Sequence, residues 1–181
     1  MSPQDPFPLP THCPVAFKEW QGVCEALAEG RQSLILRKGG IAEGPTGFVP
    51  EHQLFWLYPT HVHQADQGLK QPVSNSPPDP EGIVTLHSLA LVSLIARVET
   101  LDRLLALEPF HVWTPETVEK RFHYRTPGLW VLGVRIFHAQ HPIPIAVTPT
   151  TSAAKPGSPW TPLLPPSASS PLSTPKSSST R

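Results

Sequence analysis

The sequence has few of the residues that mark secreted, membrane-spanning or disulfide-stabilised proteins. Among 181 residues only Cys13 and Cys24 are cysteines, and such a small number argues against a disulfide framework. No apolar run approaches the roughly 20 residues that a membrane-spanning helix needs. The first residues, MSPQDPFPLP, have neither the basic start nor the apolar core of a signal peptide. We therefore expect a cytoplasmic protein without a membrane segment.

Motifs that fix a reaction are also missing. The sequence contains no GxxxxGK[ST] phosphate-binding loop, no HExxH zinc motif, no CxxC pair and no GxSxG nucleophile motif. No reaction class or cofactor is therefore indicated, and the oligomeric state stays open.

Charge is sparse, and its balance changes along the chain. Charged residues make up 15% of the chain and the formal net charge is zero. Residues 148–181 contain three basic residues and no acidic one, so the remainder carries 11 basic and 14 acidic residues. General polyanion binding depends on many phosphate contacts. A nucleic-acid ligand would accordingly need a local basic pocket.

Composition divides the chain into three parts. Residues 1–14 are proline-rich and are expected to form a disordered leader, and residues 148–181 form a disordered tail of Ser, Thr and Pro. Residues 15–147 are long enough for a single domain.

Apolar spacing within that domain predicts helices and strands in irregular order. Helices are expected at 15–29, 101–108 and 114–123, and strands at 32–37, 52–58, 83–98 and 129–138, with Pro59 ending the second strand. Gly30 is the expected stop of the first helix, in which Trp20 lies on the apolar face and Glu19 faces water, and Thr114 is the expected cap of the last helix. Residues 83–98 form one long strand or two short ones, with a buried helix as the alternative. This order disfavours a doubly wound parallel sheet. The predicted fold is α+β, a mixed or antiparallel sheet packed by about three helices. A sheet that curls into a partial barrel is one form of this prediction.

Several separated motifs resemble a known family. They are LRKGGI, His52 with Phe55, LYPT, His63-Gln64, HVWT at 111–114 and LWVLGVRIF. In this order they are similar to the bacterial family catalogued as domain of unknown function 1802, over Phe17 to His138. The resemblance implies a domain without naming its activity. A looser likeness, to RNA-associated domains of the ASCH and PUA-like type, is an analogy of fold alone.

The leading functional hypothesis is a binding module for a nucleic acid or a nucleotide-like anion. Glycines after a strand let the backbone approach an anion, and neighbouring basic and aromatic groups add charge and stacking. A basic turn and buried aromatic residues are the structural alternatives. The candidate ligand-binding residues are Arg37, Lys38, Gly39, Gly40, Tyr58, Thr60, His63, Gln64, His111, Trp113 and Arg135.

Two other hypotheses remain open. A metal-dependent hydrolase or nuclease would use His52 and His63 with Glu43, because zinc sites combine three or four N, O or S donors. A protein-interaction domain would recruit partner proteins through its proline-rich tail.

Overall fold

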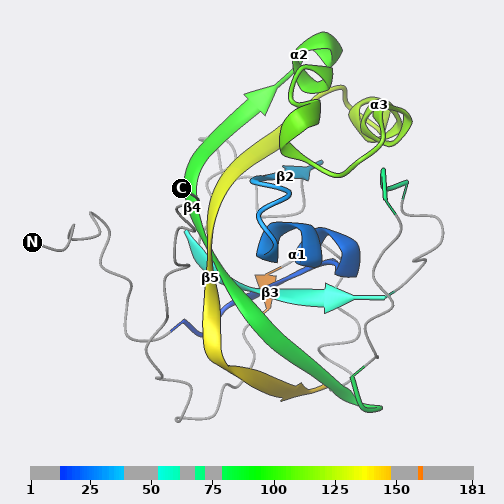
Figure 1. Cartoon of the computed structure of the whole chain (residues 1–181). Helices are drawn as coiled ribbons and strands as arrows, with labels where there is room; N and C mark the ends of the chain where they lie inside the picture. Colours follow the sequence, from blue (N-terminus) through cyan, green and yellow to red (C-terminus); the bar gives the residue numbers. More distant parts are fainter. Residues whose placement is uncertain (1–12, 39–52, 62–67, 72–78, 148–158, 161–181) are drawn as a thin grey trace, which may run out of the picture.

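A strongly curved mixed sheet organises the molecule (Figure 1). The computed structural model describes residues 13–38, 53–61, 68–71, 79–147 and 159–160. The strand order is β2-β5-β4-β3-β1-β6, and β1 is parallel to β3 while the other pairs are antiparallel. The elements are β1 (Ala16–Trp20), α1 (Gln21–Ala28), β2 (Leu34–Arg37), β3 (Leu54–Thr60), β4 (Ile83–Val98), α2 (Leu101–Leu105), the 3-10 helix η2 (Glu108–Phe110), α3 (Pro115–His123), β5 (Leu129–Ala146) and β6 (Pro159–Trp160). The predicted α+β class, mixed sheet and three α-helices are confirmed.

The curvature comes from two long strands. β4 and β5 pair from Ile83–Ala146 to Val98–Leu129, with register shifts between Leu86 and Ser88 and between Val92 and Leu94. An irregularity of this kind bends a strand and increases its twist. Figure 1 shows β4 and β5 as two arcs that bend around α1, with α2 and α3 at their upper end.

Apolar side chains fill both sides of the sheet. The larger cluster includes Phe17, Phe55 and Leu57 and extends to the helices. The smaller cluster includes Trp56 and Tyr58, together with residues of β4 and β5. Neighbouring residues of β3 thus enter different clusters, as the alternation of side chains along a strand requires.

The predicted helix at 15–29 is wrong in its first part, because Ala16–Trp20 forms β1 and the helix begins at Gln21. The first four residues of β1 are all buried. A strand buried on both faces lacks polar–apolar alternation, so its apolar residues merged with the helical spacing that follows. The consequence is functional, since Glu19 lies in a strand and not on a solvent-facing helix surface.

The ends of the helices follow the predicted signals. Gly30 has φ +73°, its N–H donates to the Leu27 carbonyl, and the Arg31 N–H donates to the Ala26 carbonyl. This pair of bonds is a Schellman motif, which ends α1 as expected from Gly30. At α3 the Thr114 hydroxyl accepts from the Thr117 N–H at 3.3 Å. The predicted cap and the predicted end at His123 are confirmed.

Two strands run through prolines that were expected to lie outside them. β3 includes Pro59, and β5 continues past His138 through Pro142 and Pro144. Beyond Trp56, β3 pairs only with β1, and beyond Gly133, β5 pairs only with β4 within the described residues. A strand tolerates proline where its missing N–H faces an edge.

Two residues of the segment expected to be disordered pair with the sheet. Pro159 and Trp160 form β6, which lies antiparallel to β1 opposite Phe17 and Ala16. No helix in the described part of the chain is long and apolar enough to cross a bilayer.

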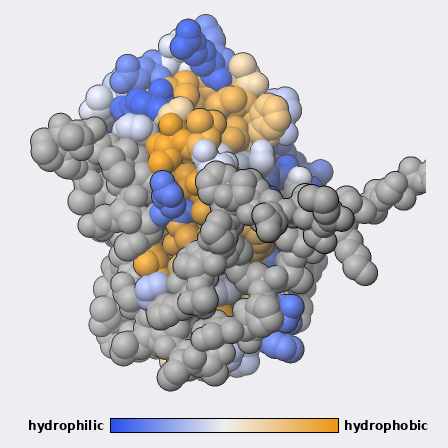
Figure 2. Space-filling model, turned by 90° about the vertical axis from the view of Figure 1, so that its left-hand side faces the viewer, coloured by the Kyte–Doolittle hydropathy of each residue, from blue (hydrophilic) through white to orange (hydrophobic). Residues whose placement is uncertain are grey.

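One side of the molecule carries a band of apolar side chains. Figure 2 shows this band on the side that lies at the left of Figure 1, where β4 and β5 run. On β4, Leu94 is 55% exposed.

Candidate functional site

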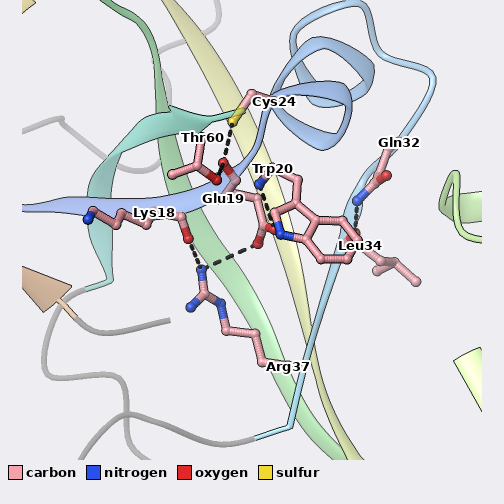
Figure 3. Close-up of polar contacts among 8 residues, drawn as sticks. All are labelled: Lys18, Glu19, Trp20, Cys24, Gln32, Leu34, Arg37 and Thr60. Carbon is pink, nitrogen blue, oxygen red and sulfur yellow. Dashed lines mark hydrogen bonds and ion pairs between the residues drawn. The ribbon is translucent and has the colours of Figure 1, made fainter. Parts of the chain in front are cut away.

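The site begins with a buried arginine at the end of β2. Arg37 is only 5% exposed. Its Nη2 donates to the Lys18 carbonyl and to Glu19 Oε2, both at 3.4 Å (Figure 3). Its guanidinium lies 5.1 Å from the centre of the Phe17 ring. Burial of a charged group is tolerated when it is paired, and here Glu19 on β1 is the carboxylate partner.

The Glu19 carboxylate is held in a fixed orientation. Its Oε1 accepts the Trp20 N–H at 3.1 Å, and its Oε2 faces Arg37 (Figure 3). Its backbone carbonyl accepts the Thr60 hydroxyl at 3.1 Å. Both the side chain and the backbone carbonyl of Glu19, near the end of β1, are therefore held by hydrogen bonds.

A second arginine reaches the same region from α3. Arg121 lies 4.5 Å from the centre of the Trp113 ring and 5.6 Å from that of Trp20, and the two indoles are 4.7 Å apart. Burial lowers the pKa of Arg121, Glu19 raises it, and the positive charge of Arg37 lowers it. Trp20 connects the two arginines, because its ring packs against Arg121 and its backbone N–H donates to the Glu19 carboxylate that pairs with Arg37.

This cluster, formed by Glu19, Trp20, Arg37, Trp113 and Arg121, has unused hydrogen-bonding capacity. Arg37 Nε and Arg121 Nη1 are buried and have no hydrogen-bond partner among the described residues. Buried polar groups without partners are rare in folded proteins. Glu19 pairs with Arg37, and no carboxylate lies within salt-bridge distance of Arg121 in the described part of the chain. The arrangement is suited to holding one anion.

Thr60 and Trp113, both predicted from the sequence, lie at this cluster. Thr60 contacts it through Glu19, and Trp113 through Arg121. Trp113 is 1% exposed, so it belongs to the core as well. Its Nε1 is another buried atom without a hydrogen-bond partner in the described part of the chain.

Tyr58 and Arg135 lie on the other side of the sheet from Arg37. Tyr58 is buried in the smaller cluster, and Lys18 lies 5.6 Å from its ring centre. Arg135 is exposed, with its guanidinium 5.7 Å from the ring of Phe137 in that cluster. The structure does not bring these two residues to Arg37.

The Lys38 ammonium group bonds to backbone carbonyls of the protein and is not left open to a ligand. Its Nζ donates to the carbonyls of Phe122, Thr126 and Gly128, the last at 3.0 Å. Burial, and to a smaller extent Arg97, lowers the Lys38 pKa. Lys38 thus holds the turn between α3 and β5.

His111 is buried two residues before Trp113. It is 3% exposed, and neither ring nitrogen has a hydrogen-bond partner of normal geometry among the described residues. Burial first, then the charge of Lys70, lowers its pKa to about 4. Its imidazole is consequently neutral at physiological pH.

The remaining candidates lie outside the described residues: Gly39, Gly40, Glu43, His52, His63 and Gln64. In the part of the chain that the structure describes, no group of three His, Cys, Asp or Glu side chains is arranged to hold a metal ion.

Sequence reasoning missed three members of the cluster, namely Glu19, Trp20 and Arg121. Glu19 and Trp20 were assigned to a helix, where Glu19 faced water and Trp20 packed in the core. Arg121 follows buried Val118 by three residues, a spacing that places both on one helix face. That spacing was a usable signal.

A family model matches most of the chain. The model for the family described as "Domain of unknown function (DUF1802)" matches residues 16–175. The chain belongs to this family. The match confirms the resemblance and extends it beyond His138 into the Ser/Thr/Pro-rich tail, which the sequence motifs had left outside.

Solved structures of ASCH from Zymomonas mobilis are similar to the DUF1802 chain. One has 12% sequence identity and a TM-score of 0.49, with 81% of this chain and 85% of that chain covered. A single-substitution variant of the same protein has 11% identity and a TM-score of 0.49, with 81% and 88% covered. No curated protein matches. What the domain binds is therefore inferred from its own residues.

Proposed function

We propose that this DUF1802 domain binds a nucleotide-like anionic ligand, free or within a nucleic acid, at the cluster around Arg37 and Arg121. The supporting observation is that Arg37 pairs with Glu19 and Arg121 packs against Trp113 and Trp20 beside this pair, while each arginine keeps a buried N–H without a partner in the described residues. A phosphate oxygen satisfies such donors through charge-assisted hydrogen bonds.

The composition of the cluster favours a nucleotide over a simple inorganic anion. Trp20 is half-buried beside Arg121, and a partly accessible indole offers a face to a base. Thr60 adds a hydroxyl at the end of β3. The slightly acidic remainder of the domain argues for one local contact and not for a long polyanion track.

The test is ligand binding by variants of the two arginines. Adenosine monophosphate and a short single-stranded oligoadenylate are titrated at low salt, with calorimetry and tryptophan fluorescence as readouts. We expect Arg121→Gln to weaken binding by about tenfold or more, because a lost charged hydrogen bond costs about 1.5–3 kcal/mol. Arg37→Lys is expected to weaken it as well, since lysine keeps the charge but not the planar donor fork.

Arg103→Gln is the matched control, because Arg103 is exposed on α2. Removing the Arg37 charge alone leaves Glu19 buried without its partner. A second Arg37 variant, Arg37→Gln, is therefore combined with Glu19→Gln. Thermal unfolding checks that each variant is folded. If folded Arg121→Gln bound both ligands as wild type does, the proposed site would be excluded.

A further inference from the structure

We infer that the turn between α3 and β5, residues 123–127, binds single-stranded nucleic acid. This surface is separate from the cluster of Arg37 and Arg121, so the inference goes beyond the proposed function. All five residues of the turn are exposed, and they are His123, Tyr124, Arg125, Thr126 and Pro127. Tyr124, a large aromatic residue, is 57% exposed and is therefore available to a partner.

Tyr124 and Arg125 place an aromatic ring beside a cation. The Arg125 guanidinium lies 5.2 Å from the centre of the Tyr124 ring. An exposed aromatic ring holds an unpaired base by stacking, because every base has a π-face, and a guanidinium donates charge-assisted hydrogen bonds to phosphate. A base and its neighbouring phosphate therefore match this pair, whereas an acidic peptide would use the cation and leave the ring without a stacking partner.

The backbone at Arg125 supports a role for its side chain. Arg125 has φ +58° and is the only non-glycine residue with a positive φ in the described part of the chain. Glycine adopts this conformation without the steric cost that a Cβ adds. An arginine in a conformation that suits glycine is a local strain, and strain of this kind is typical of functional sites.

Hydrogen bonds from two cations hold the turn and occupy carbonyl groups in and beside it. Lys38 Nζ donates to three of these carbonyls, and Arg97 Nη2 donates to the Pro127 carbonyl at 3.1 Å. The Gly128 N–H also donates to the Phe122 carbonyl at 3.3 Å. Carbonyl oxygens repel phosphate, so their bonds to these donors favour an anionic ligand. A turn that is fixed before binding also lowers the entropy cost of taking up the ligand.

The charged groups around the turn indicate a small anionic footprint. No acidic residue follows Glu119 in the chain. Glu116 and Glu119 are exposed earlier on α3, and Glu99 lies 3.7 Å from Arg97. Arg125 has no carboxylate within salt-bridge distance among the described residues. The turn therefore suits contact with about one or two phosphates, and not a long polyanion track.

The experiment measures binding of the full-length protein to a short, fluorescently labelled oligoadenylate by anisotropy at low salt. Tyr124→Leu is expected to weaken binding at least about fivefold, because it removes the stacking ring, and Tyr124→Phe keeps wild-type affinity. Arg125→Gly removes the cation at a backbone conformation that glycine adopts easily. We expect it to weaken binding at least about threefold and to reduce the salt dependence, with an unchanged or higher thermal midpoint.

Arg103→Gln, which removes an exposed arginine from α2, is the matched control and keeps wild-type affinity. Wild-type affinity of folded Tyr124→Leu or Arg125→Gly for the oligoadenylate overturns the inference. A polyglutamate that competes as well as the oligoadenylate overturns the nucleic-acid class in favour of an acidic peptide. A duplex of the same length that binds as tightly overturns stacking on Tyr124.

Adenosine monophosphate separates this surface from the proposed function. We expect Arg125→Gly to bind it as wild type does, because Arg37 and Arg121 are unchanged. Equal losses of affinity for both ligands would show that the turn is not a separate surface. An Arg121→Gln protein that binds both ligands as wild type does excludes the cluster and leaves this inference standing.

Discussion

At the scale of single residues, several buried polar atoms lack a hydrogen-bond partner in the described part of the chain. They include atoms of Arg37, Arg121, His111 and Trp113, and Arg121 packs against the Trp113 ring. His111 and Trp113 are two positions apart, and His111 has extended backbone angles, so both side chains project to the same side. Each such atom costs folding free energy, and a bound ligand is one physical reason to retain them.

His111 predicts a specific loss of stability in acid. Its folded-state pKa of about 4 lies below the usual value of 6.5, so the unfolded chain takes up this proton first as the pH falls. The stability that the neutral His111 side chain contributes is fully present above about pH 6.5. It is lost progressively as the pH falls toward about 4. Between pH 7 and pH 5 we expect a loss of about 2 kcal/mol in unfolding free energy.

Denaturant unfolding at both pH values measures this loss. In His111→Gln the pH dependence is expected to be smaller by the same amount, whatever the stability of the variant at pH 7. His87→Gln, at an exposed position of β4, is the control and keeps the wild-type slope. Equal slopes in wild type and His111→Gln would contradict the assignment.

At the scale of elements, the sequence signals were reliable where one physical cause dominated. The Thr114 cap and the Gly30 stop act locally, and they were found. β4 matched its apolar run from Ile83 to Val98, although periodicity alone left a helix open. β1 was missed because both of its faces are buried, which depends on tertiary contacts. The same error hid Glu19, and therefore the partner of Arg37.

Lys38 connects β2 to the turn between α3 and β5. A sequence interpretation treated it with Arg37 as one basic loop, but Arg37 is the last residue of β2 and bonds to β1, whereas Lys38 follows the strand and bonds to the turn. Lys38→Met removes three hydrogen bonds to carbonyls. We expect unfolding free energy to fall by about 2 kcal/mol, because hydrogen bonds from charged groups contribute about 1.5–3 kcal/mol.

Chemical denaturation checks this value. Lys120→Met, at an exposed position of α3, is the matched control and is expected to change stability by less than about 0.5 kcal/mol. A Lys38→Met protein as stable as wild type, with weaker nucleotide binding, would return Lys38 to the ligand site.

At the scale of the whole molecule, the two faces of the sheet separate the candidate residues. Arg37 belongs with Glu19 and the larger cluster, whereas Tyr58 and Arg135 lie with the smaller one. Spacing within one strand does not show how separate strands align with one another, and that alignment decides which of their side chains share a face. A set of polar residues that looked uniform along the chain is thus divided in space.

Pro159 and Trp160, beyond residue 147, also belong to the sheet as β6. β6 pairs with the edge of β1 opposite Ala16 and Phe17, and an unpaired edge strand is a template for association with another chain.

A chain ending at residue 147 lacks β6 and leaves the edge of β1 uncovered, whereas a chain ending at residue 161 keeps β6. We expect the shorter chain to self-associate as concentration rises and to lose about 1 kcal/mol of unfolding free energy, while the longer one behaves as the full-length protein. Light scattering and denaturant unfolding of the three chains measure this, and identical behaviour of the two truncations would show that β6 does not protect β1.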